Sequence, residues 1–301
     1  MTAQSSYKLH LPQNIKVHWA GAEVSNHYIA CEALDVRYGL YTCYPFVERA
    51  VLGTKTSPIV CCPWQKDDPA FKIPQHIIGR QTHTIQDSGL FTLMFGSQAG
   101  KRPASIINKW YDGLVEFTLK NGKGATCVEV DCQKILGVEE AWRFRERLRQ
   151  DIPNRIINVF HLEDGQKGLD RLIEFSDYIA ISVPELRFAG KKNYVSTLAR
   201  YIKNKKPEID IHLLGCTEAK LLEENRFCTS ADSTSWIAGK RFGFVSGYHK
   251  SRLKTKEVQE LVGLDVWEKV HEYNNEENTN FMCYSVYMHK QKYTRICGSQ
   301  L

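Results

Sequence analysis

Eight short runs of β-branched, aromatic and other apolar residues recur along the chain, and a segment with helical periodicity follows most of them. Short runs of this composition are typical of β-strands. The runs are Ile15–Ala20, Tyr38–Thr42, His83–Asp87, Ala125–Asp131, Ile156–His161, Tyr178–Ser182, Ile209–Gly215 and Arg226–Asp232. Because strands that alternate with helices form a parallel sheet, eight such units predict an α/β protein with a (β/α)8 TIM barrel.

Helical patterns fill the intervals between the expected strands. In Ala104–Asn121 the apolar residues recur at the spacing of one buried helix face. The proline-rich stretch Cys43–Ile78 is interpreted as a long connection within the barrel, not as a domain boundary. The other helices expected before Asp232 are Glu23–Leu34, Val138–Gln150, Gly168–Phe175, Tyr194–Lys203 and Thr217–Asn225.

The pattern changes after Asp232. Thr255–Tyr273 predicts one long helix, Phe281–Tyr293 predicts a second, and Asn274–Asn278 is interpreted as a polar loop between them. We therefore expect a barrel domain at residues 1–254 and a C-terminal helical extension at residues 255–301 that packs on the barrel.

Composition excludes several classes of protein. The 301 residues include 40 Lys+Arg and 34 Asp+Glu, and the formal net charge of +6 is ordinary for a globular chain. Runs of about 18 apolar residues are absent, so we expect no membrane span. The polar segment Met1–Lys16 does not resemble a signal peptide. Ten cysteines without a C-x-x-C pair favour free thiols in a reducing cytoplasm.

The carboxyl ends of the expected strands carry the candidate catalytic residues, because active sites of (β/α)8 barrels form at these ends. Three converging aspartates would shift each other's pKa and divide into a nucleophile and an acid/base, as in the cleavage of glycosidic bonds. The alternatives are aspartates that cap helices or turns and, for the histidine, a buried hydrogen-bonded side chain. The residues are Asp87, Asp131, His161, Ser182, Gly215 and Asp232.

Four segments at these strand ends resemble the motifs of a known family. They are Asp87-Ser88-Gly89-Leu90-Phe91-Thr92, Val130-Asp131-Cys132, the stretch His212–Leu222, and Ala231-Asp232-Ser233-Thr234-Ser235-Trp236. In order and approximate spacing they resemble the D-S-G-G-F-Q, L-D-E-C, H-L-M-G-V-G-x-P-x-x-L-L and F-D-C-V-x-P-T-R motifs of tRNA-guanine transglycosylases. The resemblance covers about residues 80–243, and each segment falls at a strand end chosen independently of it.

This resemblance implies a (β/α)8 enzyme that exchanges guanine for a 7-deazaguanine base within a nucleic acid. Asp232 would be the nucleophile that attacks C1′ of the target nucleotide, and Asp87 would be the general acid/base for the leaving and entering purines. Asp131 would accept hydrogen bonds from the Watson–Crick edge of guanine.

The resemblance also implies the other base-binding positions. His161 stands where the family has a Gln that contacts the base, and Ser182-Val183 stands where it has a Gly-Gly pair. Phe91 would stack on the base or form a wall of the pocket, and Gly215 belongs to the shared H-L-x-G motif.

The chain departs from the family after the nucleophile. Of the family's C-x-C-x-x-C…H zinc site, only Cys283, His289 and Cys297 stand in the corresponding region. Their C-x5-H-x7-C spacing could hold a structural zinc ion with a fourth ligand, but we favour core or tail residues, and the chemistry requires no cofactor. Trp236 replaces the P-T-R stretch, and the chain is shorter than the tRNA enzymes. These features are more similar to the phage and bacterial-island branch that modifies DNA.

We therefore expect a transglycosylase that inserts a preQ0-like base into DNA, in the cytoplasm or, for a bacteriophage protein, in the host cytoplasm. Its partners would be DNA and the free 7-deazaguanine base, with no membrane partner and an open oligomeric state. One alternative is a tRNA-guanine transglycosylase of the queuine, preQ1 or preQ0 type. The other is a non-catalytic nucleic-acid-binding subunit with the same fold.

Basic residues gather in small groups that a polyanion could use. One such group is ordinarily a solvated surface, whereas several in one chain favour a phosphate-rich partner. The expected phosphate-binding residues are Lys101, Arg102, Lys240, Arg241, Lys250, Arg252, Lys254 and Lys256.

Overall fold

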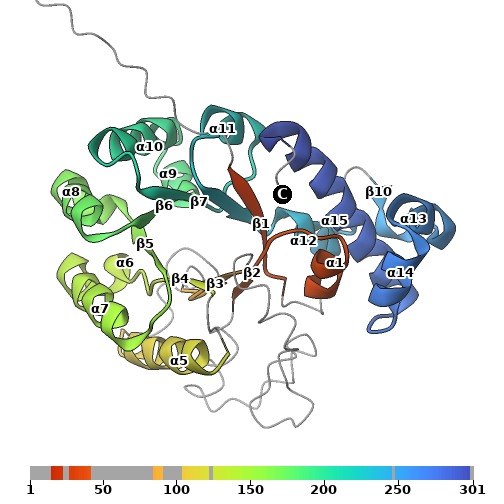
Figure 1. The fold of residues 1–301 in the computed structure, drawn as a ribbon, viewed down its shortest axis with the longest axis horizontal. Helices are drawn as coiled ribbons and strands as arrows, with labels where there is room; N and C mark the ends of the chain where they lie inside the picture. Colours follow the sequence, from red (N-terminus) through yellow and green to blue (C-terminus); the bar gives the residue numbers. More distant parts are fainter. Residues whose placement is uncertain are drawn as a thin grey trace, which may run out of the picture.

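The computed structural model describes residues 15–22, 27–41, 84–90, 104–121, 125–245 and 248–298. Eight parallel strands close into a barrel in sequence order, which confirms the predicted (β/α)8 TIM barrel (Figure 1). β4 and β8 are shorter than predicted. The strands are β1 (Lys16–Ala20), β2 (Tyr38–Tyr41), β3 (Thr84–Asp87), β4 (Thr126–Val128), β5 (Ile156–Phe160), β6 (Tyr178–Ser182), β7 (Asp210–Leu214) and β8 (Ser230–Ser233).

Helices follow the strands and surround the barrel (Figure 1). The described helical elements as far as residue 242 are α1 (His27–Ala33), α5 (Ile106–Asn121), α6 (Gln133–Leu136), α7 (Val138–Asp151), η3 (Leu162–Asp164), α8 (Gly165–Phe175), α9 (Val183–Phe188), α10 (Tyr194–Lys205), α11 (Ala219–Glu224) and α12 (Ser235–Phe242). Each helix predicted before Asp232 corresponds to a helix of the structure, which also contains the unpredicted helices α6, α9 and α12 and the 3-10 turn η3.

Side chains along each strand alternate between the barrel interior and the layer of helices. Ile179 and Ile181 of β6 belong to the large apolar cluster that the helices share. Tyr178 and Ala180, the neighbouring residues, belong to a separate cluster with inward-facing residues of β4, β5 and β7. Because this alternation has a period of two, Ser182 at the end of β6 also faces the interior.

The chain after β8 differs from the prediction. The single helix predicted over Thr255–Tyr273 is wrong, because Gly263 adopts a φ of 92° and separates two helices. A positive φ favours glycine and ends an α-helix. The elements are β9 (Phe244–Val245), β10 (Tyr248–His249), η4 (Lys250–Arg252), α13 (Thr255–Val262), α14 (Leu264–His271) and α15 (Glu276–Cys297).

Helix α15 packs against α1, α11 and α12, and it also contacts α13 and α14 (Figure 1). Its Tyr293 ring meets the Trp19 ring of β1 edge-on, with centroids 5.4 Å apart. Lys290 Nζ donates a hydrogen bond to the Leu34 carbonyl oxygen at 2.7 Å. The predicted extension therefore is helical and lies on the barrel, where α15 covers the outer side of β1. The division into two domains at residue 254 stays a prediction.

Among the helices that the structure describes, none is both long and apolar enough to cross a membrane.

A buried ionic network joins α7 to the strands next to it. Arg145 Nε donates to both carboxylate oxygens of Glu129, at 2.8 and 3.1 Å, and Arg145 Nη2 donates to the Val159 carbonyl oxygen at 2.7 Å. Arg145 Nη1 lies 3.4 Å from Asp164 Oδ1. These charged side chains are almost fully buried, so each needs the others as counter-charges.

Arg145→Ala should lower the free energy of unfolding by about 3–5 kcal/mol, because two buried carboxylates lose their counter-charge. Arg143→Ala is the matched control on the same helix, since Arg143 is exposed and pairs only with Glu140 of the preceding turn. It should cost less than about 0.5 kcal/mol. Urea unfolding followed by circular dichroism measures both variants, and equal losses would contradict the role of the buried network.

Candidate active site at the carboxyl ends of the strands

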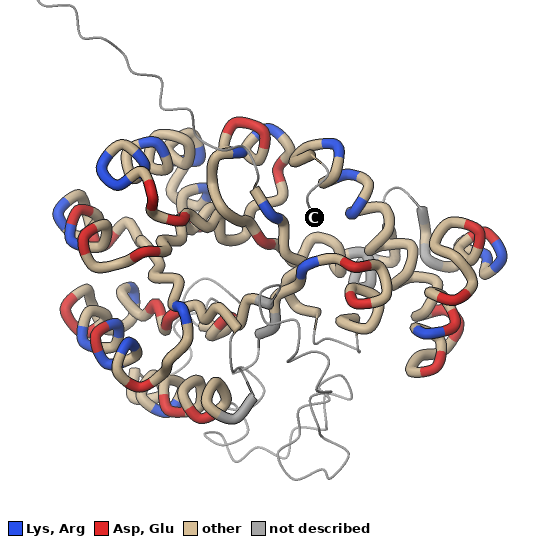
Figure 2. Tube along the Cα trace, in the orientation of Figure 1, with Lys and Arg blue, Asp and Glu red and all other residues tan. Residues whose placement is uncertain are grey.

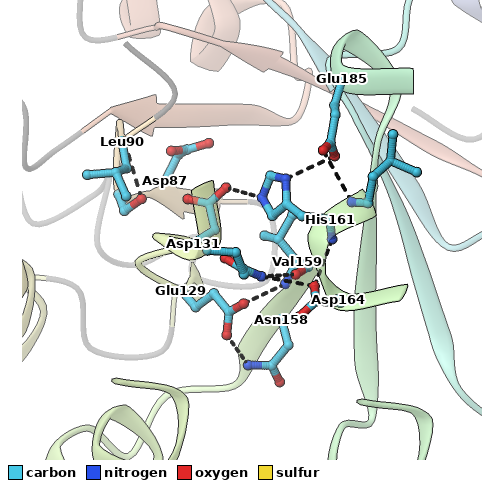
Figure 3. Close-up of polar contacts among 12 residues, drawn as sticks. Asp87, Leu90, Glu129, Asp131, Asn158, Val159, His161, Asp164 and Glu185 are labelled. Atoms are coloured by element: carbon cyan, nitrogen blue, oxygen red, sulfur yellow. Dashed lines mark hydrogen bonds and ion pairs between the residues drawn. The ribbon is translucent and has the colours of Figure 1, made fainter. Parts of the chain in front are cut away.

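The barrel brings the predicted aspartates to its carboxyl end. Asp87 ends β3, Asp131 follows the neighbouring β4, and Asp232 lies in β8. Figure 3 shows Asp87, Asp131 and His161 in one group, with the Asp131 carboxylate directed at the His161 ring. Parallel strands that close into a barrel direct such side chains toward one common space. The sequence prediction of strand-end carboxylates around one opening therefore agrees with their positions.

His161 is held between two carboxylates. Its Nε2 lies 2.9 Å from Asp131 Oδ2, and its Nδ1 lies 2.9 Å from Glu185 Oε2 (Figure 3). All three side chains are buried. Glu185 Oε1 also accepts a hydrogen bond from the Leu162 backbone N–H at 3.2 Å. An imidazole with both ring nitrogens facing carboxylates donates from both when it is protonated.

The two carboxylates hold a proton on His161. Burial by itself would lower the pKa of His161, but the hydrogen bonds and charges of Asp131 and Glu185 outweigh burial and raise this pKa to about 10. Burial would raise the pKa of Glu185, whereas the hydrogen bond from His161 lowers it. At neutral pH the site therefore contains an imidazolium between two carboxylates, which fixes the orientation of the Asp131 side chain.

A second layer of hydrogen bonds fixes the backbone of His161. Asp164 Oδ2 accepts from the His161 backbone N–H at 2.9 Å and from Gln133 Nε2 at 3.1 Å. Asp164 also contacts Arg145, so the buried ionic network of α7 holds the residue that binds the His161 backbone. Figure 3 shows the hydrogen bond between the Asp164 carboxylate and the His161 backbone.

Asp232 is positioned by the end of β7. Its Oδ1 accepts a hydrogen bond from the Gly215 backbone N–H at 2.6 Å. Gly215 has a φ of 66°, and a Cβ at this position would lie 2.6 Å from Pro184 Cγ. Both the backbone conformation and the lack of space require glycine here. The base-binding role predicted for Gly215 is untested; the structure places its N–H on the candidate nucleophile.

A line of polar side chains inside the barrel leads to Asp232. Tyr178 Oη lies 2.6 Å from Ser230 Oγ, and Ser230 Oγ lies 2.5 Å from His212 Nδ1. His212 Nε2 is 3.4 Å from Asp232 Oδ1, longer than an ordinary hydrogen bond. These contacts are satisfied when Tyr178 donates to Ser230, Ser230 donates to His212 Nδ1, and the Nε2–H of His212 faces the Asp232 carboxylate.

His18 of β1 lies beside this line of polar side chains. Burial, together with the nearby His212 and Arg37, lowers its pKa to about 3. His18 therefore stays neutral at physiological pH. A neutral His18 places no positive charge beside the Asp232 carboxylate.

The two residues at the end of β6 face opposite ways. Ser182 is buried, and its Oγ has no hydrogen-bond partner among the described residues, so it is available to a ligand. Val183 is fully buried in the apolar cluster shared with the helices, which directs its side chain away from the barrel opening. The base contact predicted for Val183 therefore stays a prediction for its backbone, because its side chain packs in the apolar cluster.

Asp87 forms a local turn. Its Oδ1 accepts a hydrogen bond from the Gly89 backbone N–H at 2.6 Å. Trp110 of α5 donates from Nε1 to the Ser88 carbonyl oxygen at 2.6 Å and ties this turn to the helix layer. Asp87 can form this turn and still act as an acid/base, because the hydrogen bond from Gly89 uses only one of its two carboxylate oxygens.

Several predicted residues lie outside the described residues or side chains. Phe91, Lys101 and Arg102 fall in an undescribed segment, and the side chains of Lys240, Arg241 and Lys250 are likewise not described. Arg252, Lys254 and Lys256 are exposed. Lys254 pairs with Glu257 at 3.5 Å, and acidic residues lie among the basic ones on α13 and α14 (Figure 2). Their binding to phosphate stays a prediction.

The three weak zinc candidates cannot share one ion. Cys283, His289 and Cys297 all lie on the continuous helix α15. At a rise of about 1.5 Å per residue, the two cysteines are roughly 21 Å apart along the helix axis. Both are buried, and His289 Nδ1 donates to the Ser285 carbonyl oxygen at 2.9 Å. Their described contacts are those of core side chains.

One other group has the composition of a metal site. Ligand atoms of His161, Glu163 and Glu185 lie within 4.8 Å of one another. The imidazole nitrogen that would bind a cation already faces Glu185, and the raised pKa of His161 keeps a proton on the ring. A metal ion would have to displace that proton, so the described contacts favour a proton in this position.

The sequence analysis missed Glu185, Arg145, Asp164 and His212. Glu185 lies in the first turn of α9, shortly after β6 ends at Ser182. An acidic residue shortly after the end of a strand was the signal that could have identified it. His212 lies two residues before Leu214, whose side chain belongs to the cluster inside the barrel, so His212 also faces the interior. A histidine at an interior position of a strand was therefore a second signal of a site residue.

No protein-family model matches the sequence, and no curated protein matches it either. The likeness to transglycosylases therefore depends on the four motifs and on the positions of their aspartates.

The stability of the protein should fall as the pH rises from about 7 toward 10. An unfolded histidine loses its proton near pH 6.5, whereas folded His161 keeps it up to about pH 10. The contribution of this proton is complete below pH 6.5 and is lost between these two values, with a limiting slope of about 1.4 kcal/mol per pH unit.

Urea unfolding of the wild type and of His161→Gln across this pH range measures the effect. Titrating groups that do not interact with His161 are shared by the two proteins and cancel in the difference between their unfolding free energies. The difference should shrink as the pH rises. Parallel curves would show that His161 does not take up a proton on folding.

Proposed function

We propose that this protein exchanges guanine for a 7-deazaguanine base in DNA. The observation that carries the proposal is the convergence of Asp87, Asp131 and Asp232 on one barrel opening, each at a position that matches a transglycosylase motif. Two of the three are oriented by hydrogen-bond partners, Asp131 by His161 and Asp232 by the Gly215 backbone N–H. A cluster of oriented carboxylates suits glycosidic chemistry.

The exchange proceeds by two displacements at C1′. A carboxylate oxygen of Asp232 attacks C1′ while the bond from C1′ to guanine N9 breaks, and Asp87 supplies the proton that the leaving guanine needs. The incoming base gives its N9 proton to Asp87, and its N9 attacks C1′ and releases Asp232. Two inversions retain the configuration of the nucleotide.

The base is recognised by one oxygen of Asp131. Oδ2 is occupied by the His161 imidazolium, which leaves Oδ1 to accept from N1–H or the exocyclic amine of guanine. Ser182 Oγ, buried and without a described partner, is a further group for a base edge. The target nucleotide must leave the base stack to reach this depth, so the substrate is single-stranded or flipped.

The exchange assay tests the function. DNA and tRNA that contain radiolabelled guanine are incubated side by side with the protein and a free 7-deazaguanine. Loss of label from DNA is the expected result. Loss from tRNA alone would favour the tRNA enzyme, and loss from neither would favour the non-catalytic nucleic-acid-binding subunit.

Asp232→Asn should abolish label loss and leave DNA binding nearly unchanged, because the amide keeps the size of the side chain but is a poor nucleophile. Asp265→Asn is the matched control, since Asp265 is an exposed aspartate on α14 and away from the barrel opening. Exchange by Asp232→Asn at the wild-type rate would remove Asp232 from the mechanism.

His212→Asn should lower kcat by up to about 100-fold with little change in KM, because a misplaced nucleophile slows the chemical step. Tyr178→Phe removes only the far end of the line of polar side chains and should cost less. Steady-state kinetics and thermal unfolding of both variants separate positioning from loss of fold. If kcat falls only in proportion to the loss of thermal stability of each variant, a positioning role for His212 is contradicted.

A further inference from the structure

A cavity of about 530 Å³ lies where α11, α12, β9 and α15 meet. Trp236 forms part of its apolar lining and is buried, whereas Phe244 in the same lining is 58% exposed. An exposed aromatic ring at the edge of a cavity provides a face on which a planar group can stack.

Among the described residues, the charged side chains that line the cavity are all basic. Lys292 and Arg295 line it from α15, and its described lining contains no carboxylate. Both cations are exposed, and neither forms an ion pair with a carboxylate of the described residues. The cavity therefore combines a stacking surface with cations free to bind an anion, which is the chemistry of a nucleotide with its phosphate.

The same two chain segments hold Asp232 and form one wall of the cavity. Gly215, whose N–H binds Asp232 Oδ1, is followed closely by Ala219 of the lining, and Asp232 itself is followed closely by Ser235. The cavity is thus next to the candidate nucleophile on the outer side of these two turns.

We propose that this cavity binds the nucleotide adjacent to the target guanine in a single strand of DNA. The neighbouring base stacks on Phe244, and its phosphate binds Lys292 and Arg295. This inference rests on the proposed function, since Asp232 defines which nucleotide is the target.

Fluorescence anisotropy with labelled oligonucleotides tests the inference. One probe is a thymidine oligonucleotide with a single central dG, and the second has abasic sites on both sides of that dG. The two probes carry the same phosphates, so a difference between them reports only the neighbouring bases.

Phe244→Ala should weaken binding of the first probe by about fivefold or more and leave the abasic probe unchanged, because one stacked base is lost. Lys292→Gln and Arg295→Gln should weaken both probes. Each should reduce the slope of log Kd against log salt concentration by about 0.7, the loss of one phosphate contact on a single strand.

Tyr273→Ala and Lys167→Gln are the matched controls. Tyr273 is 57% exposed at the end of α14, and Lys167 is exposed on α8, so both lie outside the cavity. Neither should change Kd. If Phe244→Ala binds both probes as the wild type does, the stacking subsite is overturned. Competition by inorganic phosphate that is unaffected by Phe244→Ala would show a site for free anions and would also overturn it.

The exchange assay on the same variants separates this inference from the proposed function. If the wild type exchanges label and the three cavity variants bind and exchange as well as it does, the subsite is wrong and the function stands. If binding depends on Phe244, Lys292 and Arg295 while no exchange occurs in the wild type, the subsite stands and the function is wrong.

Discussion

The pairing of β8 with β1 is the contact on which the arrangement of the site depends. It aligns His18 with Asp232 and closes the sheet, so every strand has a neighbour on both sides. Side chains along a barrel strand alternate between the interior and the helix layer. A residue at the end of a strand that falls on an interior position must therefore point to the common opening. Asp87 and Asp232 therefore both face the barrel opening because of their positions in β3 and β8.

Much of this architecture was predictable because it is local. A strand is visible in a few residues, and each expected run corresponds to a strand of the barrel. The break at Gly263 was not visible, because periodicity across Thr255–Tyr273 continues through a glycine whose φ only the fold determines. The early end of β4 also depends on a contact distant in sequence. Glu129, directly after Val128, pairs with Arg145 of α7, and the apolar run that predicted the strand does not reveal this partner.

The site was predictable in its aspartates but not in its electrostatics. Strand ends can be read from the sequence, whereas the partners of His161 come from the turn after one neighbouring strand and the end of another. The charge of His161 depends on the balance between burial and those two carboxylates, which no spacing rule expresses. His212 was quoted only as the first residue of a motif, because its role depends on facing the barrel interior near Asp232.

The position of α15 has a consequence for the order in which the barrel can be completed during synthesis. Among the described elements, β1 leaves the ribosome before the other strands, yet Trp19 on its outer side packs against Tyr293 of α15, the last described helix. Growing chains emerge at about 5–20 residues per second, so this apolar surface stays uncovered for tens of seconds by that rate. Until α15 arrives, Trp19 and the neighbouring apolar residues are a natural binding surface for chaperones that hold nascent chains.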